Sequence, residues 1–214
     1  MSKTCAIFDL DGTLVDSRRD LANAVNLMRN DYGLPSLSLE KITSYIGNGA
    51  TKLCERALGS NEYDINEALT RFKQHYHEHM TDTTKTYPGV EIGLEALVAA
   101  GIPCAVVTNK PQSAAEKILN ALNIAKNFSM IVGGGGDFPL KPEPAALLHF
   151  ARINGCKPAD CCMVGDHYTD LTAAANAGMK SIFAKWGFGQ PGQASYDIIA
   201  DSFAHAAKLI LSMN

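Results

Sequence analysis

Four groups of polar side chains that could do chemistry each follow a short apolar run of the sequence. The groups are Asp9, Asp11, Gly12 and Thr13; Thr108 and Asn109; Lys141, after a run of glycines; and Asp166, His167 and Asp170. Carboxylates gathered in one place repel one another unless a cation offsets their charge. Oxygen ligands with few carboxylates suit Mg²⁺, especially beside a phosphate. The residue types therefore indicate a Mg²⁺-dependent site for a phosphate ester.

The first group contains two aspartates that could divide the chemistry between them. Asp9 and Asp11 are separated by one residue, so on an extended strand their side chains point to the same side. Asp9 could attack phosphorus as a nucleophile, while Asp11 protonates the leaving oxygen and later takes a proton from water. Gly12 would allow a sharp turn and offer a backbone N–H to the phosphoryl group. Thr108 and Lys141 would hold the phosphoryl oxygens.

The last group supplies the remaining carboxylates. Asp166 would complete the metal site, and Asp170, one helical turn later, would orient Lys141 or a metal-bound water. Between them lies His167. It could make activity depend on pH near neutrality, or it could be a spectator that hydrogen-bonds within its loop.

The elements that must position these groups can be predicted from apolar spacing. Buried strands are expected at 5–8, 104–107, 130–132, 162–164 and 182–184. Amphipathic helices are expected over 114–122 and 145–151. Alternating helices and apolar strands are typical of an α/β protein with a Rossmann-like parallel sheet. Ligands bind such sheets at the carboxyl ends of the strands, where the four groups would meet.

A stretch without strand signals interrupts this alternation. Residues 17–82 show helical spacing, and Tyr87-Pro88-Gly89 marks the return to the sheet. We therefore predict a core domain of residues 1–16 and 83–214, with a small helical domain of residues 17–82 inserted after the first strand.

Here the sequence resembles a known family. The stretches that carry the resemblance are Phe8-Asp9-Leu10-Asp11-Gly12-Thr13-Leu14, Val107-Thr108-Asn109, Lys141-Pro142 and Gly165-Asp166 with Asp170. They resemble, in order, the four motifs of the haloacid dehalogenase-like phosphohydrolases. The resemblance implies a four-helix cap on the α/β core, Mg²⁺ bound by the carboxylates of Asp9 and Asp166, and a further contact from the Asp11 carbonyl.

The sequence is also similar to the phosphoglycolate phosphatase branch of that family, both within the inserted segment and beyond it. The similarity lies in Ile46-Gly47-Asn48-Gly49-Ala50, in Arg56-Ala57-Leu58 and in Trp186-Gly187-Phe188. It implies 2-phosphoglycolate as the leading substrate. Among cap residues, Asn48, Lys52 and Arg56 are candidates for selecting the substrate. The loop of Gly47, Asn48 and Gly49 could contact substrate or be a plain turn.

The composition limits the partners. The 214 residues are 46% hydrophobic and carry a net charge of −3, which disfavours nucleic acid as a main partner. No apolar run reaches the roughly 20 residues of a membrane span. Residues 1–4 lead into the short apolar run at 5–8 and then two aspartates, which is too short and too acidic for a signal peptide. The six cysteines read as reduced core thiols. A cytoplasmic enzyme for a small phosphorylated metabolite is expected, as a monomer or a homodimer.

Other interpretations of these residues stay open. A phosphosugar mutase would share the core, and a non-catalytic module would use the site for phosphate binding alone. Dehalogenation is disfavoured because it would not need Asp11 or a metal. Residues 133–136 are expected to form a flexible glycine loop that delivers Lys141. His75, His77 and His79 resemble a metal tract, but only the first and third share a helix face.

Overall fold

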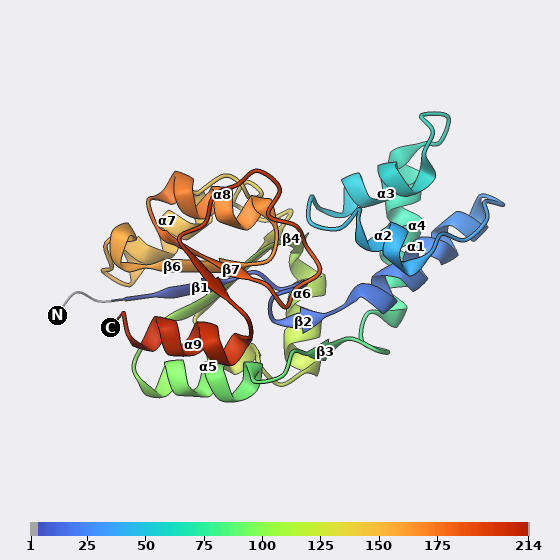
Figure 1. The fold of residues 1–214 in the computed structure, drawn as a ribbon. Coiled ribbons are helices and arrows are strands. Elements are labelled where there is room, and N and C mark those ends of the chain that lie inside the picture. Colours follow the sequence, from blue (N-terminus) through green and yellow to red (C-terminus); the bar gives the residue numbers. More distant parts are fainter. Residues whose placement is uncertain (1–3, 214) are drawn as a thin grey trace.

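A parallel sheet flanked by helices forms the core of the protein (Figure 1). The computed structural model describes residues 4–213, so the start of the chain that bears on the signal-peptide prediction lies largely outside the described residues. Within them the sheet has six strands in the order β5-β4-β1-β6-β7-β8. The strands are β1 (Ala6–Phe8), β4 (Cys104–Pro111), β5 (Met130–Gly134), β6 (Cys162–Gly165), β7 (Lys180–Ala184) and β8 (Ile198–Ala200). The predicted α/β fold class is confirmed.

Apolar side chains on both faces of the sheet explain why its strands are buried. The core helices are α5 (Val90–Ala99), α6 (Gln112–Ala121), α7 (Ala145–Ile153), α8 (Tyr168–Ala177) and α9 (Phe203–Leu211), with short 3₁₀ turns at Ala125–Asn127 and Pro158–Asp160. Phe8 packs in the cluster that α5, α6 and α9 cover, whereas Ile7 packs in the cluster beneath α7 and α8. Successive side chains of a strand point to opposite faces, so β1 joins both halves of the core.

Two predictions about the core need correction. The glycine loop predicted at residues 133–136 is partly strand, because Gly133 and Gly134 belong to β5. A Cβ at Gly133 would lie 2.5 Å from the Cα of Gln112, so the glycine lets the start of α6 pack directly against β5. The strand β8 was missed: only three residues long and partly exposed, it has little apolar pattern to detect.

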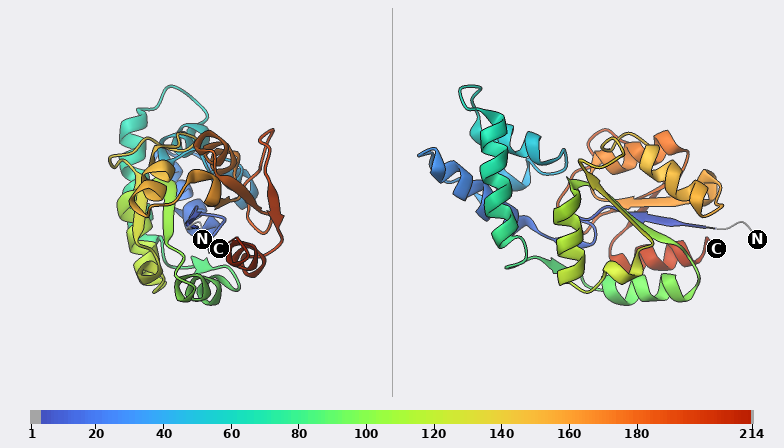
Figure 2. Two further views of the ribbon diagram at one scale, coloured as in Figure 1. Left: turned by 90° about the vertical axis from the view of Figure 1, so that its left-hand side faces the viewer. Right: turned by 180° about the vertical axis from the view of Figure 1, so that it is seen from behind.

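A helical cap lies between two short strands of the chain. It contains α1 (Arg18–Asp31), α2 (Leu39–Thr43), α3 (Ala50–Leu58) and α4 (Ile65–His79), in agreement with the inserted four-helix cap. Before and after it, β2 (Val15–Asp16) and β3 (Lys85–Thr86) pair antiparallel as a two-stranded ribbon. Figure 2 shows the cap helices standing at one end of the sheet. The domain boundaries at residues 17–82 stay a prediction.

Asp20 links the two chain segments that connect the core to the cap. This carboxylate of α1 accepts hydrogen bonds from the backbone and hydroxyl groups of both Thr83 and Thr84, over 2.6 to 3.1 Å. Burial alone would raise the pKa of Asp20, but these hydrogen bonds lower it below its ordinary value. The carboxylate thus stabilises the folded state in its charged form.

Replacing Asp20 by Ala should lower the free energy of unfolding by about 2–4 kcal/mol, because it leaves several donors unpaired. The pKa of Asp20 is lowered on folding, so its contribution is present above an unfolded pKa of about 3.9 and is lost as the pH falls further. Urea unfolding at pH 7 measures the effect. Asp82→Ala, at an exposed carboxylate paired with His79, is the matched control. Equal losses in both variants would contradict the role of Asp20.

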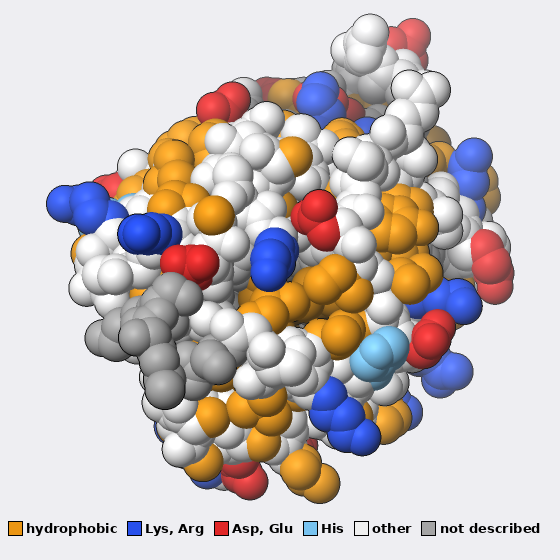
Figure 3. All heavy atoms as spheres, turned by 60° about the vertical axis from the view of Figure 1, so that its left-hand side comes forward, with side chains coloured by type: hydrophobic (Ala, Val, Ile, Leu, Met, Phe, Trp, Pro, Cys, Tyr) orange, Lys and Arg blue, Asp and Glu red, His pale blue; other side chains and the backbone are white. Residues whose placement is uncertain are grey.

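The outer surface mixes charges of both signs. Figure 3 shows Lys, Arg, Asp and Glu side chains interspersed with hydrophobic ones over one face of the molecule. Across residues 4–213, no helix combines the length and the apolar character needed to cross a bilayer.

Candidate active site

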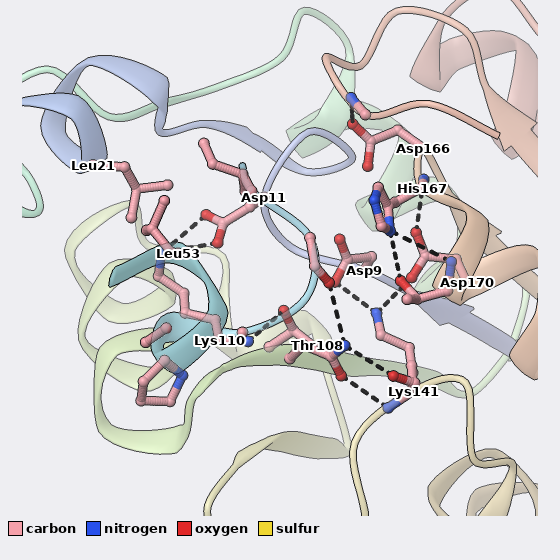
Figure 4. A pocket seen from close by; sticks show the side chains of 18 of the residues that line it. Asp9, Asp11, Leu21, Leu53, Thr108, Lys110, Lys141, Asp166, His167 and Asp170 are labelled. Carbon is pink, nitrogen blue, oxygen red and sulfur yellow. Dashed lines mark hydrogen bonds and ion pairs between the residues drawn. The ribbon is translucent and has the colours of Figure 1, made fainter. Parts of the chain in front are cut away.

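A pocket between the cap and the carboxyl ends of the core strands collects most of the predicted site residues (Figure 4). The core contributes Asp9, Asp11, Thr108, Asn109, Lys110, Pro111, Lys141, Asp166, His167, Thr169, Asp170, Phe188 and Gly189 to its lining. The cap contributes Leu21, Ile46, Gly47, Gly49, Ala50, Leu53, Phe72 and Tyr76. The four polar groups therefore meet at one edge of the sheet, as parallel strands require.

Lys141 lies between two of the aspartates. Its Nζ is 2.7 Å from Oδ1 of Asp9 and 2.7 Å from Oδ1 of Asp170, and it donates a 2.6 Å hydrogen bond to the carbonyl of Val107. Its side chain is 2% exposed. Burial would lower the pKa of Lys141, but the charges of Asp170 and Asp9 raise it above its ordinary value. The lysine is therefore a fixed cation at the base of the pocket.

Asp166 lies beside this ion pair at the end of β6. Its Oδ2 accepts hydrogen bonds of 2.9 Å and 2.6 Å from the backbone N–H groups of Phe188 and Gly189, in the loop after β7. Burial, together with the charges of Asp170 and Asp9, raises the pKa of Asp166 well above its ordinary value. Burial likewise raises the pKa of Asp9 to about 6, although Lys141 opposes the shift.

These carboxylates fit a divalent cation. Oxygens of Asp9, Asp166 and Asp170 lie within 4.8 Å of one another, and all three residues are buried. The ammonium of Lys141 balances only part of their charge, so repulsion adds to burial in raising the pKa values of Asp9 and Asp166. Hard oxygen ligands of this kind favour Mg²⁺ or a similar ion. This acidic cluster is where the chain could hold such an ion.

The turn after β1 differs from the strand that the Asp9 and Asp11 spacing suggested. β1 ends at Phe8, and the chain turns at Gly12, whose φ is +86°. Both carboxylates still line the pocket, so the turn and not strand alternation places them. A Cβ at Gly12 would lie 1.9 Å from Oδ2 of Asp166. Only glycine allows the backbone this close to the acidic cluster.

Asp11 has a partner that the sequence interpretation missed. Nζ of Lys110 lies 3.0 Å and 2.9 Å from the two carboxylate oxygens of Asp11, and it donates a 2.6 Å hydrogen bond to the hydroxyl of Tyr76 in α4. Ser17 donates a further 2.5 Å hydrogen bond to Asp11. The signal was available for Lys110, because β4 continues to Pro111 and a residue two places after Thr108 lies on the same side of a strand.

Thr108 and Asn109 both line the pocket, but the amide of Asn109 is engaged by the backbone of another segment. Its Oδ1 accepts a hydrogen bond from the backbone N–H of Lys141, and its Nδ2 donates to the carbonyls of Lys141 and Gly47. Asn109 therefore positions Lys141 and touches the cap. Thr13 is fully buried and lies outside the lining that the described residues form.

The predicted cap residues fall into two groups. Gly47 and Gly49 line the pocket, while Asn48 donates a 2.6 Å hydrogen bond to the hydroxyl of Tyr168 in the core. Lys52 pairs with Glu55, and Arg56 donates to the carbonyl of Tyr45. Lys52 and Arg56 are exposed and are not among the described residues that line the pocket. Their predicted contact with substrate stays untested.

His167 caps α8. Its Nδ1 lies 2.9 Å from the hydroxyl of Thr169, and the backbone N–H of His167 donates to Asp170 in return. Burial lowers the pKa of His167 to about 4, against the opposing attraction of Asp9. The imidazole is therefore neutral at pH 7, which favours the spectator interpretation over the pH-sensing one.

Replacing His167 by Ser should leave the pH profile of kcat/KM unchanged between pH 6 and 8, because Ser also caps a helix and neither side chain titrates there. The wild type should lose stability as the pH falls below about 6.5, because His167 is protonated there in the unfolded state but stays neutral in the folded state. The serine variant should lack this loss. If kcat/KM of the wild type titrated between pH 6 and 8 and that titration were absent from the variant, the spectator interpretation of His167 would be wrong.

The other histidines and cysteines lie apart from the pocket. His75 pairs with Asp31 and His79 with Asp82, so the histidine tract of α4 makes separate surface contacts. All six cysteines are buried, which agrees with their interpretation as core thiols. Cys5, Cys156 and Cys161 gather at the amino ends of β1 and β6, at the opposite edge of the sheet from the acidic cluster.

Comparison with known proteins agrees with this site. A family profile described as haloacid dehalogenase-like hydrolase matches residues 6–184. The chain belongs to this family. The match covers the core strands β1 to β7 and the whole cap, and it confirms the resemblance seen in the four motifs.

Relatives of this haloacid dehalogenase-like hydrolase are named as phosphatases. The phosphoglycolate phosphatase of Chromobacterium violaceum is 38% identical over 209 residues, which cover 95% of this chain and 94% of the relative. That of Aquifex aeolicus is 38% identical over 182 residues, covering 85% and 84%. The crystal structure of a predicted phosphoglycolate phosphatase from Haemophilus somnus has a TM-score of 0.91 at 34% identity and covers 98% of each chain. The protein is a phosphatase of this family.

Proposed function

We propose that this phosphatase hydrolyses a small phosphate monoester, with 2-phosphoglycolate as the leading substrate, through an aspartyl-phosphate on Asp9. The observation that carries the proposal is that each of the two aspartates has its own lysine partner, on opposite sides of the pocket. Asp9 lies against Lys141 on one side and Asp11 lies against Lys110 on the other, over 2.7 Å and 2.9 Å. The two aspartates therefore stand in different surroundings, as a nucleophile and an acid–base group require.

In the first half of the proposed reaction, a carboxylate oxygen of Asp9 attacks phosphorus and the bond to the ester oxygen breaks. Asp11 gives its proton to the departing oxygen, so the leaving group departs as an alcohol. Lys141 and the hydroxyl of Thr108 hold oxygens of the transferring group, where negative charge is spread. In the second half, Asp11 takes a proton from water, the water attacks phosphorus, and the bond to Asp9 breaks to release phosphate.

The proposed metal is Mg²⁺, held by carboxylates of Asp9 and Asp166 with the carbonyl of Asp11. Bound there, it would neutralise phosphoryl charge and reduce the repulsion between the aspartates. Asp170 lies close enough to join this set, but its 2.7 Å contact with Lys141 supports its predicted role of orienting the lysine. The partner is then a small phosphorylated metabolite, neither a nucleic acid nor a membrane.

The apolar cap lining favours this activity over a phosphosugar mutase. Leu21, Leu53 and Phe72 face the pocket from the cap, whereas a hexose would need polar partners for several hydroxyls. Analysis of products from a hexose 1-phosphate separates the two reactions. An isomer would indicate a mutase, and free phosphate a hydrolase.

Phosphate release from a panel of phosphorylated metabolites tests the proposed function. We expect kcat/KM to be highest for 2-phosphoglycolate. EDTA should abolish the activity, because it removes the cation from the carboxylate cluster, and added Mg²⁺ should restore it. Phosphate release that continues at the same rate in EDTA would contradict the metal assignment. An absence of release from every ester, with phosphate still bound, would instead support the non-catalytic module.

A further inference from the structure

The pocket offers cations at two places with different surroundings. Among the described residues of its lining, the lysines are Lys110 and Lys141, and arginine is absent. Lys141 contacts Asp9 and Asp170, which places it on the phosphoryl side. Figure 4 shows Lys110 on the other side, with Asp11 and the cap residues Leu21 and Leu53. Any second anionic group of a substrate would find its cation at Lys110.

The cap reinforces this choice. Its side chains at the pocket are apolar apart from Tyr76, among those that the structure describes. The hydroxyl of Tyr76 lies 2.6 Å from Nζ of Lys110, and the ammonium also lies 4.5 Å from the centre of the tyrosine ring. Burial keeps the phenol protonated, because the pKa of Tyr76 is raised well above its ordinary value. Lys110 and Tyr76 thus form a small donor site inside an apolar wall.

We propose that Lys110 and the hydroxyl of Tyr76 bind the carboxylate of the substrate's leaving group and so select esters that carry this carboxylate one carbon from the ester oxygen. This proposal rests on the proposed function, because it assigns the leaving-group side of the same pocket. Such a donor site discriminates between substrates, since a neutral group in place of the carboxylate leaves a donor of Lys110 and the hydroxyl of Tyr76 without an acceptor, although Lys110 keeps its contact with Asp11.

The position of Asp11 sets the length of the leaving group. Asp11 gives its proton to the ester oxygen, and its carboxylate lies 2.9 Å from Nζ of Lys110. A carboxylate joined to that ester oxygen through one carbon reaches the neighbouring Lys110 while the ester oxygen stays beside Asp11. A longer linker would have to be accommodated among the apolar cap residues of the lining, which include Leu21 and Phe72. The lysine has three donors, so it can bind the substrate and keep one contact with Asp11.

The test compares 2-phosphoglycolate with ethyl phosphate, in which a methyl group replaces the carboxylate. In Lys110→Met, the ratio of kcat/KM for 2-phosphoglycolate to that for ethyl phosphate should fall at least about 100-fold, as for loss of a buried charge partner. The change should appear mainly in KM. Tyr76→Phe should lower the same ratio by about 3- to 10-fold, and Lys110→Arg should keep part of it, because the charge remains.

Binding gives a second readout that does not depend on turnover. In the Asp9→Asn background with Mg²⁺, calorimetry should show that Lys110→Met weakens binding of 2-phosphoglycolate far more than binding of ethyl phosphate. Lys185→Met is the matched control, since Lys185 is an exposed lysine paired with Asp201. This control should keep the wild-type ratio.

The two proposals fail in different ways. A wild-type protein that releases phosphate from neither ester overturns the proposed function. A wild-type phosphatase whose Lys110→Met variant loses both esters in equal proportion overturns the carboxylate site alone. If Lys110→Met does not fold, Tyr76→Phe and Lys110→Arg decide the question, and unchanged substrate ratios in both overturn the site.

Discussion

Replacing Asp9 by Asn should reduce kcat for phosphate release at least about 10⁴-fold, because an amide cannot form the proposed acyl phosphate. The variant should still fold. Asn has nearly the same shape as Asp. It also removes a carboxylate whose charged form is disfavoured by burial, which raises the pKa of Asp9 to about 6. Initial rates with 2-phosphoglycolate and an aryl phosphate, together with a thermal unfolding curve, measure both effects.

Asp201→Asn makes the same chemical change at an exposed carboxylate and should keep wild-type rates. Mass spectrometry of acid-quenched wild-type enzyme should detect a phosphoryl group on the peptide that contains Asp9. If Asp9→Asn kept more than about one-hundredth of the activity in a preparation free of wild-type protein, Asp9 would not be the nucleophile.

Replacing Lys141 by Met should have the second-largest effect, on both activity and stability. The substitution leaves Asp9 and Asp170 without the ammonium that lies 2.7 Å from each. Breaking a buried ion pair on one side costs about 3–5 kcal/mol, and losing a donor to the phosphoryl oxygens costs about 10²- to 10³-fold in kcat. Urea unfolding in EDTA and phosphate release in Mg²⁺ measure the two losses.

The stability loss in Lys141→Met should depend on pH in a known direction. Without the lysine, the pKa of Asp9, which burial already raises to about 6, rises further above its unfolded value of about 3.9. The folded variant then binds more protons than the unfolded chain, so its stability should increase as the pH falls from 7.5 toward 5. Lys185→Met is the exposed control. A stability deficit that grows as the pH falls would contradict the charge argument.

The sequence was sufficient to predict the core because the relevant signals are local. Short apolar runs mark strands that are buried on both faces, as at Ala6–Phe8 and Cys162–Gly165. A strand of three partly exposed residues, Ile198–Ala200, carries no such mark and was missed. The helices Leu39–Thr43 and Ala50–Leu58 entered the prediction only through the family resemblance, since they are too short for a clear apolar period.

The residues of the candidate site likewise include some that the sequence could group in advance and some that it could not. Asp9, Lys141, Asp166 and Asp170 could be grouped in advance because the carboxyl ends of parallel strands meet at one edge, whatever the details of packing. The cap residues could not be placed in this way. Lys52 and Arg56 were chosen by charge, and in the structure they contact Glu55 and the carbonyl of Tyr45, which leaves their predicted role untested. Which side of a cap helix faces the core depends on how the cap docks.

By itself, then, the sequence determined that four polar groups converge on an anionic site for a phosphate ester, and that a helical segment interrupts the core. Only the tertiary structure decided what completes that site. Lys110 lies beside Tyr76 because α4 of the cap docks over the end of β4, which joins residues 34 positions apart in the chain. Apolar periodicity encodes which face of an element is buried, but the partner that this face meets is set by the packing of the whole molecule.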